Sequence, residues 1–179
     1  MQKDFDGALK FVLAAEGGFS DDPADPGGAT CMGIEQGEYD VWRRRSGLPI
    51  QTVADITEAE AGTIYKASYW VPVHGDYVMS KTAYVLFDTG VNQGVGTAIG
   101  MMQAVLGIPV THTFDTMTSA GYHNWFAAGH SDAELAAGIL TRRLARYTAL
   151  TVENPALGKF LAGWENRVVN LRAVIEGLA

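Results

Sequence analysis

The sequence predicts a mainly α-helical protein, and three observations support this. Apolar residues recur every three or four positions over most of the chain, alternating strand patterns are scarce, and helix start signals occur at several places. Hydrophobic residues make up 47% of the 179 residues and charged residues 18%, so the chain can build an apolar core. We therefore expect one compact helical unit of ordinary domain size, with at most two lobes.

The first helix is expected over residues 4–16. Phe5 and Val12 belong to its apolar face, and Gly17 ends it because glycine readily adopts the conformation that closes a helix. The following segment, residues 17–33, is rich in glycine, proline and aspartate. These residues break helices, so we expect an irregular loop whose strands, if any, are short.

Later helices are marked by capping signals. Thr57 and Ser131 each stand three residues before a glutamate, which is the capping-box pattern. Asn154 precedes Pro155, a combination of cap and first-turn proline that starts helices. The later helices are expected at about residues 35–45, 57–70, 81–91, 98–106, 131–147 and 155–175.

Composition argues against several classes of protein. The formal net charge is −7, whereas a nucleic-acid-binding protein needs a basic surface, so no nucleic acid is expected as a partner. No apolar run approaches the roughly 20 residues of a membrane span, so membrane insertion is not expected. The single cysteine, Cys31, excludes an intrachain disulfide. The four histidines lack zinc-ligand spacing and the aspartate-rich loop lacks the EF-hand pattern, so no metal or cofactor is expected.

Glu16 is the first candidate functional residue. It continues the apolar face of the first helix, four residues after Val12. A carboxyl group on such a face must be paired or protonated, because burying an isolated charge is costly. A protonated carboxyl could serve as a general acid, whereas a paired one would be structural, and the residue alone leaves both interpretations open.

Three aspartates, Asp21, Asp22 and Asp25, follow Glu16 within nine residues. Glycoside hydrolysis commonly uses two carboxyl groups that face each other across the scissile bond, and this stretch could supply both. The same aspartates could simply shape turns, because two of them precede prolines.

A resemblance to the glycoside hydrolase family 108 N-acetylmuramidases begins at EGGFSDDPADPGGAT, residues 16–30, which CMGI follows. Residues 64–70, IYKASYW, and residues 87–107, FDTGVNQGVGTAIGMMQAVLG, are similar to later segments of the same family. Residues 153–168, ENPALGKFLAGWENRV, resemble the C-terminal peptidoglycan-binding region found with it. The resemblance therefore extends over nearly the whole chain.

The resemblance implies a lysozyme-like catalytic region over residues 1–107 and a helical peptidoglycan-binding region over residues 108–179, packed as one compact unit. It implies hydrolysis of the β-1,4 bond between N-acetylmuramic acid and N-acetylglucosamine in bacterial peptidoglycan, with Glu16 as the acid. Phage-type lysozymes place an aspartate nine residues after the glutamate and a threonine a few residues later. This looser similarity adds Asp25 and Thr30 to the expected catalytic residues.

Substrate contacts are expected from two further pairs of residues. Asn92 and Gln93, at a helix end, could bond the acetamido groups of the sugars or cap the helix. Tyr69 and Trp70 could stack on a sugar ring or belong to the core. Trp164 is expected in the core, since it lies on the apolar face of the last helix.

Two alternatives to hydrolysis remain open: a lytic transglycosylase acting on the same bond, and a catalytically silent peptidoglycan-binding or virion protein. The resemblance to phage endolysins implies a monomer that is made in the host cytoplasm. Charged residues interrupt residues 1–11, so no signal peptide is expected. The protein would then reach the wall after holin-type release or as part of a phage particle.

Overall fold

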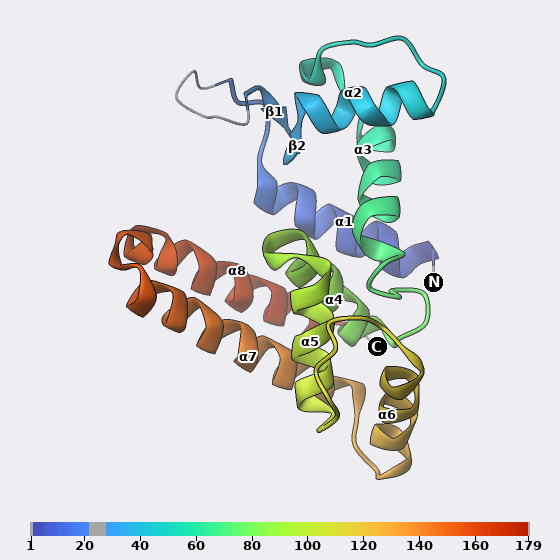
Figure 1. Ribbon diagram of the computed structural model, residues 1–179, viewed down its shortest axis with the longest axis vertical. Helices are drawn as coiled ribbons and strands as arrows, with labels where there is room; N and C mark the ends of the chain where they lie inside the picture. The colour runs from blue at the N-terminus through green and yellow to red at the C-terminus, as the bar shows by residue number, and fades with distance from the viewer. Residues whose placement is uncertain (1, 22–27, 179) are drawn as a thin grey trace. The chain divides into compact units, whose positions relative to one another are not determined.

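The chain is mainly α-helical, as predicted (Figure 1). The computed structural model describes residues 2–21 and 28–178, and within them eight α-helices and one two-stranded sheet. The chain divides into two compact units, one formed by Leu9–Ser68 and the other by Met1–Ala8 with Tyr69–Ala179. This division does not test the predicted functional boundary after residue 107, which stays a prediction.

The unit Leu9–Ser68 combines short helices with a β-hairpin. Gly17, with a φ of 83°, ends the first helix, and α3 begins at the predicted capping box of Thr57 and Glu60. The elements of this unit are the second part of α1 (Gln2–Glu16), β1 (Thr30–Cys31), β2 (Ile34–Glu35), α2 (Gln36–Arg45), the 3-10 turn η1 (Val53–Asp55) and α3 (Glu58–Tyr65).

A partly buried ion pair joins α2 to α3. Nη1 of Arg43 lies 2.8 Å from Oε1 of Glu60 and donates a second bond of 2.8 Å to the hydroxyl of Tyr39. Burial alone would raise the pKa of the Glu60 carboxyl, but hydrogen bonds from Thr57 and Tyr39 and the charge of Arg43 lower it below its ordinary value. The pair therefore stabilises the fold at neutral pH, and its contribution is lost as the pH falls through the folded-state pKa of Glu60.

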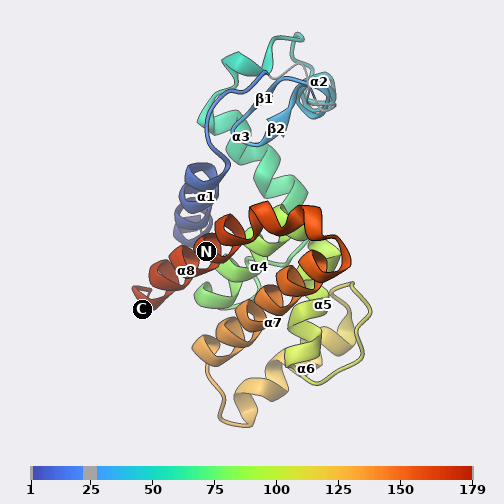
Figure 2. The ribbon, with the colours of Figure 1, turned by 90° about the vertical axis from the view of Figure 1, so that its left-hand side faces the viewer.

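The second unit is a helical bundle built on α4, most of which is buried. Gly94, with a φ of 89°, turns the chain directly from α4 into α5, and Figure 2 shows α7 and α8 running side by side. A π-helical turn, η2 (Lys66–Trp70), leads into the unit. Its later elements are α4 (Ser80–Gln93), α5 (Val95–Val105), α6 (Thr116–Ala127), α7 (Asp132–Glu153), the 3-10 turn η3 (Pro155–Leu157) and α8 (Gly158–Glu176).

One carboxylate connects three helices of this bundle. Asp88 of α4 is 1% exposed and pairs through Oδ2 with Arg143 of α7, which is fully buried. Its other oxygen accepts bonds of 2.9 and 2.7 Å from Nε and Nη2 of Arg167 on α8. Arg143 also donates to the hydroxyl of Tyr147, which donates to Asn92 near the end of α4. The charges and hydrogen bonds of this network fix α7 and α8 against α4.

Two features of the bundle differ from the sequence-based expectations. Helix α6 was not predicted; it opens with a capping box in which Asp115 accepts a 2.8 Å bond from the backbone N–H of Thr118. This capping box was not recognised in the sequence because Thr118, the third helical residue, stands where the usual pattern has glutamate or glutamine. The last helix is also not buried along its whole expected length, since Phe160 in the first turn of α8 is 46% exposed. Trp164, one turn further on, is half-buried and stacks on Tyr147 at 4.9 Å.

We predict that Asp88→Asn lowers the free energy of unfolding by about 3–5 kcal/mol, because it leaves the buried Arg143 without its counter-charge. Urea denaturation followed by circular dichroism measures the change. The control is Asp76→Asn at an exposed position, which should change the free energy by less than about 0.5 kcal/mol. A loss below about 1 kcal/mol in Asp88→Asn would show that the bundle does not depend on this carboxylate.

Candidate active site

Glu16 is the last residue of α1 and is half-buried. Val12, one turn earlier on the same face, is fully buried, so the helix delivers the carboxyl group to the border between core and solvent. The positive φ of Gly17 turns the chain away immediately afterwards. The side chain of Glu16 is therefore presented at a helix end, next to the start of the glycine-rich loop.

The β-hairpin that follows α1 lies against Glu16 through its turn. Its turn consists of Met32 and Gly33, which have φ values of 52° and 74°, the left-handed backbone of a two-residue type I′ turn. A Cβ atom on Gly33 would lie 3.0 Å from Cγ and 3.1 Å from Cβ of Glu16, and 2.6 Å from the hydroxyl of Tyr65. Only glycine therefore allows the turn to pack against the stem of Glu16.

Tyr65 at the end of α3 holds this turn from another side. Its buried side chain donates a 2.8 Å hydrogen bond from the hydroxyl to the backbone oxygen of Met32. Neither Tyr65 nor Gly33 was among the site residues predicted from the sequence. The sequence carries only a weak signal for this hairpin, because Met-Gly is not one of the dipeptides typical of a type I′ turn.

Thr30, the predicted catalytic threonine, lies on β1 in the same unit as Glu16. Its backbone N–H donates to the oxygen of Ser20 and its oxygen accepts from the N–H of Ser20, both at 2.8 Å. These bonds close the base of the loop between the two residues. Across the hairpin, Thr30 pairs with Glu35, so their side chains share one face of the sheet.

Asp25, the other predicted catalytic residue, lies outside the described residues, as does Asp22. Within residues 2–21 and 28–178, no three histidine, cysteine, aspartate or glutamate side chains gather into a possible metal site. The absence of a metal in the loop of residues 22–27 stays a prediction. None of the helices in the described parts of the chain is both long and apolar enough to span a membrane.

The four predicted substrate-binding residues lie in the other compact unit. Asn92 accepts a hydrogen bond from Tyr147, whereas both amide atoms of the neighbouring Gln93 are buried and have no partner among the described residues. Tyr69 is half-buried. Trp70 is 0% exposed and packs edge-on against Phe87, with 5.5 Å between the ring centroids. This position agrees with the interpretation that Trp70 belongs to the core.

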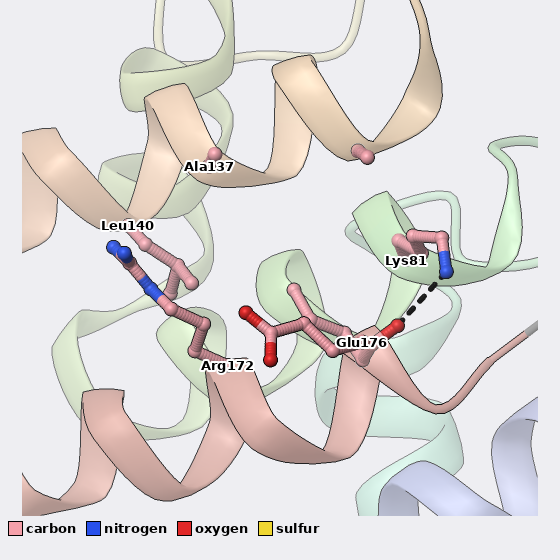
Figure 3. A pocket seen from close by; sticks show the side chains of 7 residues that line it. Lys81, Ala137, Leu140, Arg172 and Glu176 are labelled. Atoms are coloured by element: carbon pink, nitrogen blue, oxygen red, sulfur yellow. Dashed lines mark hydrogen bonds between the residues drawn. The ribbon is translucent and has the colours of Figure 1, made fainter.

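A cavity of about 330 Å³ in the helical bundle lies between α7 and α8 (Figure 3). Ala137 and Leu140 of α7 face Arg172 and Glu176 of α8 across it. Lys81 of α4 lies at one end, where its ammonium group donates to backbone oxygens near the C-terminus of α8. This lysine is therefore occupied in capping a helix.

A glutamate at the end of the first helix of a mainly α protein is what the resemblance to lysozyme-like glycoside hydrolases implied, whereas the packing of its stem against a hairpin turn was not predicted. Residues 9–94 match the family model described as Glycosyl hydrolase 108. SagA of Brucella abortus has a similar solved structure, with a TM-score of 0.77 and 26% identity over 98% of this chain and 95% of that chain. No curated protein matches the chain.

Residues 9–94 are thus similar to glycosyl hydrolase family 108, as the motifs predicted, and this match together with the similarity to SagA supports a glycoside hydrolase. The matched residues contain both Glu16 and the hairpin turn that holds it, as well as Asn92 and Gln93. Peptidoglycan, the expected substrate, fits this family match. The match ends at residue 94, so the predicted peptidoglycan-binding role of residues 108–179 stays a prediction.

We predict that Gly33→Ala lowers the rate of wall cleavage at least about tenfold, because the new Cβ displaces Glu16 and Tyr65 and strains a left-handed backbone. A turbidity assay on purified bacterial walls measures the rate. The matched control is Gly37→Ala, where the backbone is helical and no neighbouring atom lies within 4 Å of the added methyl group. Equal rates for the two variants would contradict the role assigned to Gly33.

Proposed function

We propose that the protein hydrolyses the β-1,4 bond between N-acetylmuramic acid and N-acetylglucosamine in bacterial peptidoglycan, with Glu16 as the general acid. The observation that carries this proposal is the packing of the Glu16 stem against Gly33 at the hairpin turn. A general acid must hold its proton in a defined place beside the leaving oxygen, and packing of its stem restricts the rotamers of the carboxyl group.

Asp25 and Thr30 are proposed to serve the attacking water on the other side of the sugar. Asp25 stands nine residues after Glu16, as in phage-type lysozymes. The paired backbones of Ser20 and Thr30 support the proposal, because they anchor both ends of the loop that carries Asp25.

Gln93 is proposed to bind an acetamido group of the glycan. Its amide offers both a donor and an acceptor that no described residue satisfies, and an acetamido group supplies the complementary pair. Asn92 is proposed to contribute through the donor half of its amide, because its oxygen already accepts from Tyr147. For the aromatic pair, Tyr69 stays a proposed sugar contact, whereas the full burial of Trp70 favours a role in the core.

A lytic transglycosylase would use Glu16 without a second carboxyl group and would release anhydro-sugar products. Mass spectrometry separates the two reactions, since an anhydro product is lighter than the hydrolysis product by one water. The peptidoglycan-binding role of residues 108–179, the monomeric state and the origin as a phage endolysin or particle component rest on the sequence resemblance and belong to this proposal.

We predict that Glu16→Gln lowers the rate of wall cleavage by about 10²–10⁴-fold, since the amide cannot donate the proton. The fold should be retained, as checked by thermal unfolding. Glu58→Gln, at an exposed position of α3, is the control and should cleave walls at the unchanged rate. If Glu16→Gln kept more than about a tenth of the activity, another group would have to be the acid.

We also predict that Asp25→Asn loses far more activity than Asp22→Asn, at least about tenfold more, because only Asp25 has the spacing expected of the second carboxyl group. Both variants should give circular dichroism spectra like that of the parent protein. A near-normal rate for Asp25→Asn would exclude the two-carboxyl scheme. Anhydro-sugar products from the same variant would instead identify a transglycosylase.

A further inference from the structure

A second cavity of the helical bundle, of about 260 Å³, lies between α5, α7 and the segment that joins α5 to α6. The whole cavity belongs to one compact unit, and Figure 2 shows the two helices side by side. The lining residues are Thr97, Gly100, Met101, Ala104, Val110, His112, Arg142 and Arg146. None of these lining residues has been used by the proposed reaction.

Two exposed arginines give this cavity a positive charge. Arg142 and Arg146 stand one turn apart on the same face of α7. Arg142 is oriented by a 3.0 Å bond from Nη2 to the oxygen of Ala104 near the end of α5, which leaves its other N–H donors available. Arg146 forms no hydrogen bond or ion pair with the described residues, and none of the lining residues is an acid. This local charge stands out in a chain of net charge −7.

His112 is built into the cavity wall. Its φ of 60° is a left-handed conformation that is costly for histidine, and the fully buried Gln103 holds it there by accepting bonds from the N–H groups of Thr111 and His112. The ring lies directly on α5, where a Cβ on Gly100 would be 2.7 Å from Nδ1. Nδ1 also lies 3.1 Å from the oxygen of Gly96. Two glycines and a buried glutamine thus place this ring.

We infer that this cavity binds a carboxylate carried on a small apolar group, the chemistry of the carboxyl end of a peptide. Guanidinium groups bind carboxylates through paired N–H donors, and no described residue accepts a hydrogen bond from Arg146. Met101, Ala104 and Val110 supply an apolar surface suited to a methyl side chain beside the carboxylate. The peptides of peptidoglycan offer such ends, and this identification of the source rests on the proposed function, whereas the carboxylate site itself does not.

The test is a nuclear magnetic resonance titration of the full chain carrying Glu16→Gln, so that catalysis plays no part. N-acetyl-alanine is the probe, and its uncharged amide is the matched control ligand. We expect saturable shifts of the residues that line the cavity, with a Kd on the order of 1 mM for so small a ligand. In the Glu16→Gln background, the further substitution Arg146→Gln should raise the Kd about tenfold or more. Arg172→Gln, which removes an exposed arginine of α8, should leave the Kd unchanged.

Several outcomes would overturn the inference. They are the absence of saturable binding, equal binding of the amide and the acid, and an unchanged Kd in Arg146→Gln. Inorganic phosphate is the third ligand, and if it bound as tightly as N-acetyl-alanine the site would be a general oxyanion site rather than one for peptide ends. Retained wall cleavage in Glu16→Gln would contradict the proposed function but would leave this result untouched, so the two proposals can fail separately.

Discussion

The helical bundle depends on the burial of a single negative charge. Asp88 is surrounded by protein on α4, and two arginines from α7 and α8 bring positive charge to its two oxygens. Charges removed from water are costly, so each partner is tolerated only while the others are in place. The three helices must therefore pack in one register. Because Arg143 also orients Tyr147, which bonds Asn92, the same constraint reaches a residue proposed to contact the glycan.

The candidate active site depends on a different kind of constraint, namely that position 33 can carry no side chain. Gly33 carries no Cβ, and this vacancy is filled by the stem of Glu16 and the hydroxyl of Tyr65. The turn is held by the left-handed backbone conformation of Met32 and Gly33 and by the hydrogen bond from the Tyr65 hydroxyl to the backbone oxygen of Met32. A carboxyl group held by packing loses little entropy when it must align with a leaving oxygen, which is the advantage that a general acid requires.

The features that the sequence determined by itself are those encoded within a few residues. The capping boxes at Thr57 and Ser131 and the helix end at Gly17 are formed as predicted, because caps and glycine backbones act locally. The motif around Glu16 is also local, and it predicted the family whose model matches residues 9–94. Helix α6 was missed because its capping pair, Asp115 and Thr118, departs from the usual residue types.

Only the tertiary structure decided which residues meet. Asp88 and Arg167 are separated by 79 positions, and no local pattern links them. The contact of Gly33 with Glu16, the burial of Trp70 and the cavity with Arg142 and Arg146 likewise arise between separate segments. A helical periodicity predicts which face of a helix is buried, but it does not identify the segment that packs against that face. Packing and charge compensation between distant segments select that partner, and they exist only in the folded chain.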